Sequence, residues 1–597
     1  MLRQTLIALL LVVSRSVAVQ TSDQISPKPL VVTPQDPVAV RDVAPGAALA
    51  DFGRDGFARP WLDIEASSPC TVVFRLGEKL LDGRVDTNPP GSVRFAEYEL
   101  QLAPGRRIYR PGLRRDPRNT MSLGKPGDDP PILMPEEIGE VYPFRYVEVL
   151  IPEGSGVSLK AVGRDMVHYP FDDEASYFHC SDSVLNAVWD LCKYSVKATS
   201  FCGIYVDGDR ERIPYEADAL INQMCHYGVD AEYGMARATL ELLTDHATWP
   251  TEWLLQMPQI AWNDYIHTGD ASFLERRYDD LVAKALIPLR DSLDLISTKG
   301  GVSADIAKAV HFNGLGGPIR DIVDWPHKGG FGSMGEDDYY EYTAHNTVVN
   351  AYHAKALDCL SKIAQTIGRK EDSQRFAEMS EATRKALRKL CFDEAAGVYR
   401  DGVESSHSAL HANVFPLAFG LVDKGDIPSV VDFIKSRGLV CSVYAAHFLL
   451  EALYEAGAGD YALSLMSSTD ERSWYNMIRE GSTITMEAWG QKYKPNQDWN
   501  HAWGAAPASA IPHGLMGVTL LAPGGSRIRF RPQPGGLDSA EAVVPTPRGG
   551  VACSFERLPD GRYRYEITVP KGVRASVELP GRGKPLSRGA GRHVFVR

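Results

Sequence analysis

The sequence predicts a multidomain chain in which an (α/α)6 toroid, residues 175–520, lies between two antiparallel β-sandwiches, residues 31–170 and 521–597. Length is the first reason: 597 residues, 44% hydrophobic and 23% charged, are too many for one hydrophobic core. Apolar and polar residues alternate near both ends, as they do in strands. Between these ends, apolar residues recur at helical spacing over about a dozen segments, the number that six helical hairpins require.

The first 18 residues have the pattern of a secretory signal peptide. Arg3 precedes a short apolar run at residues 6–13, and Ser16 and Ala18 form a small-x-small exit. The apolar run is too short to cross a bilayer. We therefore expect a periplasmic or secreted protein without a membrane span.

Residues 31–170 have the composition of an antiparallel sandwich. Apolar alternation or β-branched enrichment predicts strands at residues 71–76, 92–100, 144–151 and 157–162. Gly- and Pro-rich turns separate these segments, which is typical of a sandwich. Residues 104–135 are rich in Arg, Pro and Gly and predict a long loop, and long loops in compact domains are often functional.

Helical periodicity begins near Ser181, because Leu185, Trp189 and Cys192 fall on one face of a helix. Further helices are expected at residues 216–229, 232–245, 253–267, 281–296, 343–367, 371–390, 409–421, 427–436, 442–456, 461–466 and 505–518. From about residue 519 the pattern returns to strands. These are expected at residues 527–531, 550–555, 562–570 and 575–580. No cluster of reactive side chains falls among them, so we expect this sandwich to be structural.

Charge and missing motifs argue against several classes of function. The formal net charge is −12 and no Lys/Arg-rich run is present, so nucleic acid and anionic membranes are not expected partners. The motifs of zinc proteases, nucleotide-binding loops and serine hydrolases are absent. Nine cysteines cannot all pair and none forms C-x-x-C. Most should be buried thiols, with one or two disulfides left open.

Residues 205–218 gather acids in a loop and the first turns of a helix, which Pro214 is suited to begin. The charged members are Asp207, Asp209, Glu211, Glu216 and Asp218, with Arg210 and Arg212 among them and Tyr215 close by. Crowded carboxylates let one acid stay protonated while its neighbours ionise. By charge pattern alone, a solvated acidic turn with arginine partners is the commoner interpretation. The arginines would lower the pKa of Glu211 and the aspartates would raise it, and the sequence leaves that balance open.

A second stretch, residues 481–504, sets a carboxylate among aromatic rings. Glu487 lies two residues before Trp489, and His501 follows. Aromatic faces cover the apolar side of a pyranose, amides and carboxylates bind its hydroxyls, and a glutamate can activate water. Residues 481–504 therefore predict a sugar site.

Together the two stretches resemble glycoside hydrolase family 78, the inverting α-L-rhamnosidase family. Arg210 and Glu211 are similar to the family's arginine and general acid, and Asp218 falls at the family's seventh position after that acid. Asp207 matches a leading aspartate with a spacing about one residue shorter, and Pro214-Tyr215 replaces a Gly-Trp pair of the pocket wall. The family's general-base region is similar to Thr485, Glu487, Trp489, Asn500, His501 and Gly504, with loosely matching spacings.

Asp324 and Trp325 resemble the family's Asp-Trp pair in the sugar pocket. Isolated tryptophans are more often core residues than site residues. For Trp325 and Trp489 the neighbouring sequence favours the pocket, whereas Trp253 stays evenly divided. His501 has a competing interpretation as a satisfied core histidine, and the ligand-binding role is slightly favoured.

The resemblance covers nearly all of residues 31–597 and implies that the toroid is the catalytic domain of an exo-acting, inverting α-L-rhamnosidase. Glu211 would be the general acid and Glu487 the general base. The substrate-binding residues would be Asp207, Arg210, Tyr215, Asp218, Asp324, Trp325, Trp489 and His501. No metal or organic cofactor is implied. The expected partner is a rhamnose-containing glycan or glycoside, and the oligomeric state is not indicated.

Three alternatives remain open. A toroid of this kind can act on a different sugar, because a fold does not determine a function. It can be a polysaccharide lyase, which would need a Tyr or His base and a cluster that neutralises a uronate. It can also be a carbohydrate-binding protein without turnover, although the presence of both Glu211 and Glu487 argues against that.

Overall fold

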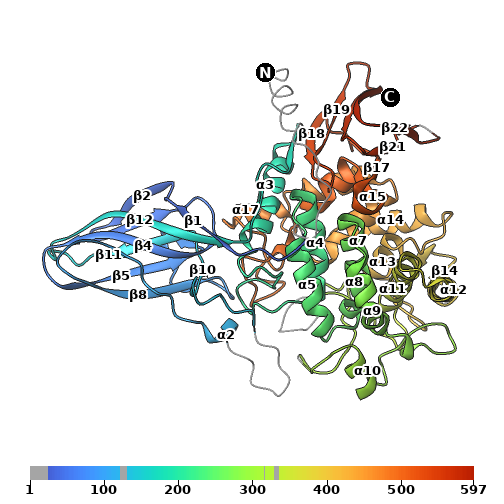
Figure 1. Cartoon of the computed structure of the whole chain (residues 1–597), viewed down its shortest axis with the longest axis horizontal. Coiled ribbons are helices and arrows are strands. Elements are labelled where there is room, and N and C mark those ends of the chain that lie inside the picture. Colours follow the sequence, from blue (N-terminus) through green and yellow to red (C-terminus); the bar gives the residue numbers. More distant parts are fainter. Residues whose placement is uncertain (1–24, 121–130, 315, 328–334, 582) are drawn as a thin grey trace.

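The computed structural model describes residues 25–120, 131–314, 316–327, 335–581 and 583–597. The predicted signal peptide, residues 1–18, lies outside the described residues. Figure 1 shows an elongated molecule in which a β-sandwich projects from a helical body, and a smaller β domain covers another face of that body. The predicted fold class, a helical toroid between two β-rich domains, is confirmed, whereas the domain boundaries stay predictions.

The N-terminal domain contains two five-stranded antiparallel sheets. One sheet consists of β1 (Val31–Gln35), β12 (Val157–His168), β4 (Phe57–Ala66), β10 (Tyr142–Pro143) and β9 (Gly105–Tyr109). The other consists of β2 (Ala39–Ala44), β3 (Ala47–Asp51), β11 (Tyr146–Leu150), β5 (Cys70–Gly77) and β8 (Phe95–Leu102). Alternate residues such as Leu62, Phe74 and Val147 are fully buried between the sheets, which explains the two-residue period. The predicted loop at 104–135 is partly wrong, because it contains β9 and α2 (Pro117–Thr120).

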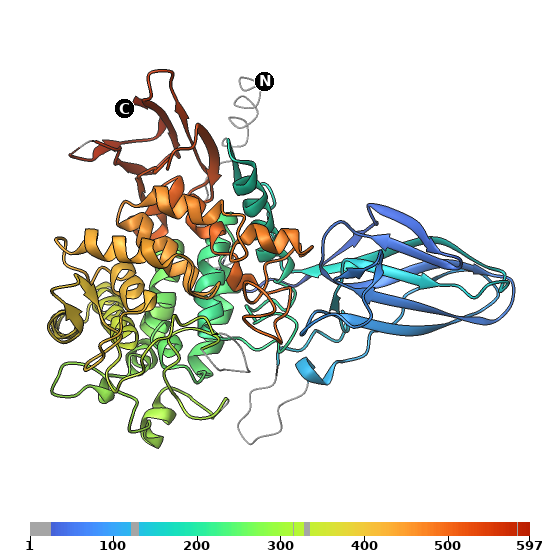
Figure 2. The same cartoon turned by 180° about the vertical axis from the view of Figure 1, so that it is seen from behind.

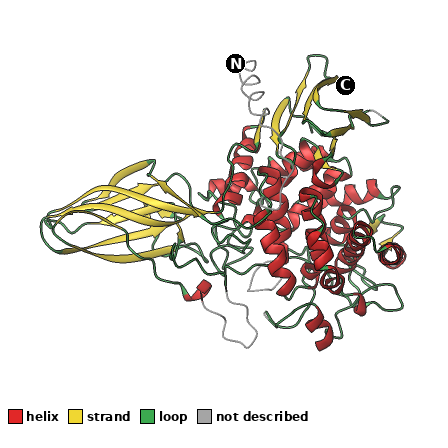
Figure 3. Cartoon of the chain, viewed as in Figure 1, coloured by secondary structure: helices red, strands yellow, loops and turns green. Residues whose placement is uncertain are grey.

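The helical body is drawn in red in Figure 3. Its longer helices are α3 (Ser183–Ala198), α4 (Glu216–Val229), α5 (Gly234–Asp245), α7 (Met257–Thr268), α11 (Thr347–Thr366), α12 (Lys370–Cys391), α13 (Leu410–Ala418), α14 (Ile427–Arg437), α15 (Ala445–Glu455) and α16 (Gly459–Met466). Shorter ones are α6 (Thr251–Leu254), α8 (Ser272–Arg276), α9 (Tyr278–Lys284), α10 (Ala304–Ala309), α17 (Trp474–Arg479) and α18 (Pro507–Ala510). Local caps define several starts: the Asp182 carboxylate accepts hydrogen bonds from the N–H groups of Val184 and Leu185, where α3 begins.

Three predicted helices are wrong in extent, and a proline lies at each of them. The helix predicted at 281–296 ends at Lys284, because Leu286 adopts a left-handed conformation (φ +54°) directly before Ile287 and Pro288. The one predicted at 253–267 is divided into α6 and α7, with Pro258 in the first turn of α7. The one predicted at 505–518 becomes α18 and the π-helical turn η5 (Ile511–Leu515). A proline inside a helix removes a backbone donor and clashes with the preceding turn, so helices restart at it.

The C-terminal domain has two sheets. The first is β13 (Tyr177–Cys180), β18 (Ser539–Val544), β19 (Val551–Arg557), β20 (Tyr563–Val569) and β23 (Gly591–Val596). The second is β16 (Val518–Leu520), β17 (Arg527–Phe530), β21 (Arg574–Val577) and β22 (Leu586–Arg588). The expectation of purely antiparallel pairing is corrected at one place, since β17 and β21 are parallel. Strand β13 precedes the toroid in the chain and pairs with β18, which follows it. This domain therefore contains chain segments from before and after the helical body (Figure 2).

All nine cysteines lie among the described residues and all are free thiols, so the disulfides left open by the sequence are not formed. Seven of them are buried, as expected for small apolar side chains. No helix in the described part of the chain combines the length and hydrophobicity needed to cross a bilayer.

Candidate active site

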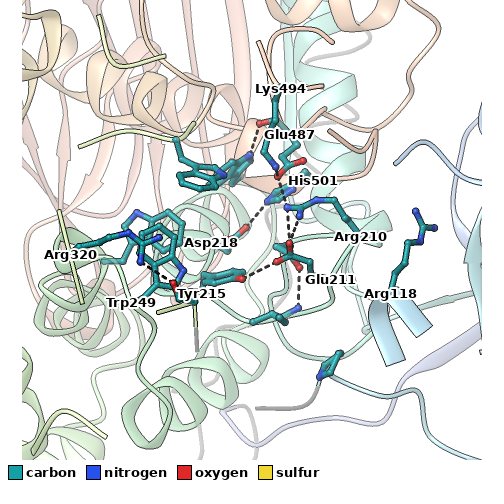
Figure 4. Close-up of a pocket in the computed structure, with 17 residues that line it drawn as sticks. Arg118, Arg210, Glu211, Tyr215, Asp218, Trp249, Arg320, Glu487, Lys494 and His501 are labelled. Carbon is teal, nitrogen blue, oxygen red and sulfur yellow. Dashed lines mark hydrogen bonds and ion pairs between the residues drawn. The ribbon is translucent and has the colours of Figure 1, made fainter. Parts of the chain in front are cut away.

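A cavity of about 270 Å³ lies where the loops around α4 and α6 meet the segment after α17. Most of the residues singled out from the sequence line it (Figure 4). Its lining contains Asp207, Arg210, Glu211, Tyr215, Asp218, Trp249, Trp253, Arg320, Trp325, Glu487, Lys494, His501 and Trp503, with Arg118, Pro131, Ile213 and Gly316. Two stretches nearly 300 residues apart in sequence therefore form one site.

Two hydrogen bonds between Asp207 and Ile213 close the loop of residues 207–213, called the acidic loop below. Asp207 N–H donates to the Ile213 carbonyl, and Ile213 N–H donates to the Asp207 carboxylate, both at 3.0 Å. The chain reverses between them, with Arg212 in a left-handed conformation (φ +55°). This reversal sends Arg212 inward, where its buried guanidinium contacts Glu140 at 2.7 Å, and leaves Arg210 in the cavity. Only one of the two arginines in this loop therefore belongs to the site.

Arg210 contacts both predicted catalytic carboxylates. Its Nη1 forms an ion pair with Glu211, and its Nη2 lies 2.8 Å from Glu487 Oε1. Glu487 is also paired with the buried Lys494, and Glu211 accepts a hydrogen bond of 2.9 Å from the Tyr215 hydroxyl. The Glu487 side chain is 1% exposed and that of Glu211 is 31% exposed. Glu211 thus faces the open part of the cavity, and Glu487 forms its inner wall.

The cations decide the pKa values of these two carboxyls. Burial alone would raise the pKa of Glu487, but the charges of Arg210 and Lys494 lower it to about 2. Burial would also raise the pKa of Glu211, and Arg210 together with the Tyr215 hydroxyl lowers it instead. The balance left open by the sequence is therefore decided by the arginine, and both carboxyls are ionised in the free site.

The pKa of Asp207 is shifted in the opposite direction. Its side chain is 3% exposed, and its Oδ2 accepts no hydrogen bond from a described residue, although Arg210 Nη2 lies 3.6 Å away. Burial, and then the negative charge of Glu211, raise the pKa of Asp207 well above its usual value. Within the acidic loop a proton is therefore held more readily by Asp207 than by Glu211.

His501 lies between two acids. Its Nε2 is 2.9 Å from Asp218 Oδ1, and its Nδ1 is 3.5 Å from Asp498 Oδ1. Burial would lower the pKa of His501, but the two carboxylates raise it to about 10. The interpretation of His501 as a neutral core histidine therefore does not hold, because the ring is an imidazolium at the wall of the cavity.

Glu487, Asp498 and His501 have ligand atoms within 4.8 Å of one another, a spacing that can suit a metal ion. The chemistry of these side chains does not suit one. Arg210 and Lys494 already neutralise Glu487. Both ring nitrogens of His501 already face acids, Nε2 towards Asp218 at 2.9 Å and Nδ1 towards Asp498 at 3.5 Å.

Aromatic rings form the wall that leads away from Glu211. Tyr215 meets Trp253 edge to face with ring centroids 5.5 Å apart, and Trp249 lies 6.2 Å from Trp253. Trp325 packs edge to face on Trp249 at 5.6 Å, and Trp503 packs 4.6 Å from the His501 ring. Flat apolar faces beside charged groups are what a pyranose ring requires of its binding site.

Two residues expected to touch sugar lie elsewhere. Trp489 is fully buried, packs edge to face on Trp474, and donates its indole N–H to the Cys441 carbonyl at 2.7 Å. Asp324 is also fully buried and accepts hydrogen bonds from His411 and from the Trp325 N–H. Neither side chain lines the cavity. Trp489 belongs to the core, and Asp324 orients the loop that presents Trp325.

Several lining residues were missed. Trp249 and Trp503 are not among the predicted site residues, and the sequence does not decide whether Trp253 belongs to the core or the pocket. Closely spaced tryptophans, at positions 249 and 253 and at 499 and 503, are the sequence signal that these residues share. Lys494 and Arg320 have no motif around them, and only the folded chain brings them to the cavity.

Comparison with known proteins places this chain in a family. Residues 173–513 match the family model described as the bacterial alpha-L-rhamnosidase 6 hairpin glycosidase domain. Residues 517–593 match the bacterial alpha-L-rhamnosidase C-terminal domain. An alpha-L-rhamnosidase of Alteromonas sp. (strain LOR) is 23% identical over 583 residues, which cover 91% of this chain and 57% of that protein. The chain thus spans little more than half the length of this relative.

Solved structures have the same fold. The crystal structure of native alfa-L-rhamnosidase from Aspergillus terreus has a TM-score of 0.75 at 20% identity, and the match covers 95% of this chain and 64% of that one. The Streptomyces avermitilis alpha-L-rhamnosidase complexed with L-rhamnose has a TM-score of 0.73 at 18% identity, with 96% and 54% covered. The first family model alone covers more than half of the chain, and it agrees with the family expected from the sequence. The chain belongs to the bacterial alpha-L-rhamnosidase six-hairpin glycosidase family.

Proposed function

We propose that this protein is an exo-acting glycoside hydrolase that releases terminal α-L-rhamnose with inversion of configuration. The observation that supports this most directly is the pair of carboxylates, Glu211 and Glu487, held by one arginine in a cavity with aromatic walls. Two named relatives, from Alteromonas and Formosa agariphila, are alpha-L-rhamnosidases, which supports the choice of sugar.

In this mechanism Glu487 is the general base. It is ionised because Arg210 and Lys494 hold its pKa low, so it can accept a proton from a water molecule without first losing one. The water would attack the anomeric carbon on the face opposite the leaving group. Inverting enzymes separate their carboxyls by about 6.5–9.5 Å to admit this water. In the free site Arg210 bridges Glu211 and Glu487, and this mechanism requires the substrate to loosen that bridge.

Glu211 is the general acid of this proposal, which requires it to carry a proton. In the free site Asp207 binds a proton more readily than Glu211, because burial raises the pKa of Asp207 and Arg210 favours the ionised form of Glu211. When a sugar hydroxyl takes over the contact with Arg210, the pKa of Glu211 rises and that of Asp207 falls as their environments change. The proton would then pass from Asp207 to Glu211 and on to the glycosidic oxygen.

The test is hydrolysis of a panel of aryl glycosides by the wild type, Glu487→Gln and Glu211→Gln. We expect release from the α-L-rhamnoside and a loss of about 10²–10⁴-fold in kcat for Glu487→Gln, the usual contribution of an acid–base group. Glu211→Gln should be impaired less on nitrophenyl than on alkyl rhamnosides, because nitrophenolate leaves without a proton. The control is Glu480→Gln, an exposed glutamate at the end of α17, which should match the wild type.

The stereochemistry has a separate test. Proton NMR during the first minutes of hydrolysis should detect β-L-rhamnose first, before mutarotation. Release of α-L-rhamnose first would contradict inversion and indicate a double displacement, for which carboxyls about 5–5.5 Å apart are typical.

The panel also decides among the alternatives. Release from another glycoside would keep the two carboxylates and replace the sugar. An unsaturated product that absorbs in the ultraviolet would indicate a lyase. Binding of rhamnose-containing glycans without any product would indicate a binding protein. Secretion or periplasmic location stays a proposal from residues 1–18, tested by N-terminal sequencing of the protein recovered from its native host.

A further inference from the structure

Among the described residues, four Lys and Arg side chains line the cavity, and three of them are paired with acids. Arg210 and Lys494 are paired with Glu487. Arg118 lies 2.9 Å from Asp116. Arg320 is the exception, because no described carboxylate forms an ion pair or hydrogen bond with it. Partial burial lowers its pKa, and no charge on a described residue counteracts this, as expected for a cation without a neighbouring anion.

Neutral groups hold the Arg320 guanidinium in place. Its Nη1 donates to the carbonyls of Gly316 at 2.9 Å and Pro318 at 3.2 Å. The guanidinium carbon lies 3.7 Å from the centroid of Trp249, over the ring face. Its backbone is fixed as well, since Arg320 N–H donates to the Trp249 carbonyl at 3.0 Å and Thr251 N–H donates to the Arg320 carbonyl. The side chain is therefore positioned without losing its charge.

The loop before Arg320 is shaped for this arrangement. Gly316 has φ +79°, and a Cβ there would lie 2.0 Å from Trp249 Cδ1. A glycine is therefore needed for the carbonyl to reach the guanidinium beside the indole ring. The Nε and Nη2 groups of Arg320 make no hydrogen bond to any residue in the described part of the chain. These two adjacent donors form the fork with which arginine binds carboxylates and sulfates.

The position of Arg320 indicates which part of a substrate it meets. Tyr215, Trp253 and Trp249 lead in that order from Glu211 to Arg320, and Figure 4 shows Arg320 and Trp249 on one side of Glu211 with Arg118 on the other. Arg320 is exposed, so it stands at the rim of the cavity. A chain of net charge −12 would repel anionic glycans, and an uncompensated cation at the rim counteracts this locally.

We propose that Arg320 binds an anionic group of the glycan at the rim of the cavity, so that the preferred substrates are acidic rhamnose-containing glycans. The anion is a carboxylate of a uronic acid next to the terminal sugar, or a sulfate ester. This inference rests on the proposed hydrolysis, because it assigns the rim to the part of the substrate that adjoins the scissile bond.

The experiment compares three substrates: α-L-rhamnosyl-D-glucuronic acid, the matching α-L-rhamnosyl-D-glucose, and the latter carrying a sulfate ester. Wild type should cleave at least one acidic substrate with a kcat/KM above that of the neutral one. Arg320→Gln should lower that kcat/KM by about tenfold, mainly through KM, and leave the neutral substrate unchanged. Arg320→Lys should recover part of the loss. A loss confined to the uronic acid substrate would identify the anion as a carboxylate, and a loss confined to the sulfated substrate would identify it as a sulfate.

The matched control is Arg369→Gln. Arg369 also covers an aromatic ring, that of Tyr278 at 4.2 Å, but it does not line the cavity, so all three substrates should be cleaved as by the wild type. Equal losses on acidic and neutral substrates in Arg320→Gln would overturn the inference, because they would indicate a structural role. Wild-type kinetics that do not depend on the charge of the substrate would also overturn the inference.

Failure of the inference and failure of the proposed function are distinguishable. If the wild type cleaves the neutral substrate but Arg320→Gln changes nothing, hydrolysis stands and the anion site does not. If the wild type cleaves none of the three, calorimetry of the same compounds with wild type and Arg320→Gln decides. Binding of the acidic compounds that needs Arg320 would support the anion site and reject the hydrolase, and absence of such binding would reject both.

Discussion

Arg210 determines the charge state of the candidate site, because it is the residue in contact with both Glu211 and Glu487. In its absence the pKa of Glu211 should rise, because burial is the largest single influence there and Arg210 is the largest one that opposes it. A residue expected only to bind substrate thus controls the two expected to do the chemistry.

This leads to a prediction for the pH dependence of catalysis. The pKa of Glu487 is about 2, so in the wild type this proposed base stays ionised throughout the ordinary pH range. In Arg210→Gln its pKa should rise, and the acidic limb of kcat/KM should move upward into the range of pH 4–6, where carboxyls with ordinary or raised pKa values titrate. Lys494→Gln is the comparison, because it should move the same limb while leaving the Arg210–Glu211 contact in place. A limb that does not move in either variant would mean that Glu487 is not the titrating base.

His501 also makes the stability of the fold depend on pH, and its stabilising contribution is lost at high pH. Its folded pKa, about 10, exceeds the ordinary value of 6.5. Its charged pairing with Asp218 and Asp498 therefore stabilises the fold fully below about pH 6.5, and the contribution is lost as pH rises through 10.

We expect His501→Gln to lower the free energy of unfolding by about 2–4 kcal/mol at pH 6, because two buried acids lose their cation. The thermal unfolding midpoint should fall accordingly. Near pH 10 the difference from the wild type should be much smaller. His513→Gln is the control: burial lowers the pKa of His513 to about 4, so that ring is neutral at both pH values and its loss should cost the same at both. A difference for His501→Gln that is constant from pH 6 to 10 would contradict the imidazolium.

At the scale of elements, prolines and tight contacts set where helices end. The π-helical turn η5 packs Gly514 against α15 so closely that a Cβ would lie 2.3 Å from the Tyr454 ring. This contact explains why the chain leaves α-helical geometry here, since an extra residue in the turn brings the glycine to face the ring. It also makes the turn intolerant of any side chain at position 514.

Gly514→Ala should therefore destabilise the protein by about 1–3 kcal/mol, the usual cost of overpacking, although alanine favours helices. The matched variant is Gly300→Ala, at a glycine with ordinary φ and open space around its missing Cβ, which should leave the unfolding midpoint unchanged. Equal midpoints for the two variants would show that the Gly514–Tyr454 contact relaxes freely.

At the scale of the whole molecule, the N-terminal sandwich contacts both chain segments that form the candidate site. Arg94, just before β8, donates from Nε to the buried Asp209 at 2.7 Å, in the middle of the acidic loop. Glu78 of the same domain accepts a hydrogen bond of 2.9 Å from Asn500, beside His501. The two stretches that form the cavity are therefore both held by a domain that contributes neither Glu211 nor Glu487.

Arg94→Gln should reduce both stability and activity although residue 94 does not line the cavity. Removing one partner of a buried ion pair costs about 3–5 kcal/mol, and among the described residues Asp209 would keep Arg212, at 3.1 Å, as its ion-pair partner. The acidic loop would lose its position, so kcat should fall along with the unfolding midpoint. Lys160→Gln breaks an exposed pair with Glu65 in the same sandwich and should change neither quantity measurably.

Local pattern was sufficient for much of the fold and for part of the site. Helix α4 has the bounds expected from its sequence, because Pro214 and the apolar period that follows it act within the same few residues. The segments expected at 71–76 and 562–570 contain strands β5 and β20, since alternation reports a buried face directly. Spacing likewise placed Glu211 and Asp218 on one side of one cavity.

The sequence by itself determined the order of the domains, most of their elements, the family and the pair of carboxylates, because these depend on periodicity and on motifs of neighbouring residues. The tertiary structure alone decided that Trp489 is core and Trp249 is wall, and that the pKa of Asp207 is raised while that of Glu211 is lowered. It also decided that Arg320 has no carboxylate partner among the described residues. The reason is physical: burial and Coulomb interactions depend on distances between groups that lie up to hundreds of residues apart in the chain, and no local pattern encodes those distances.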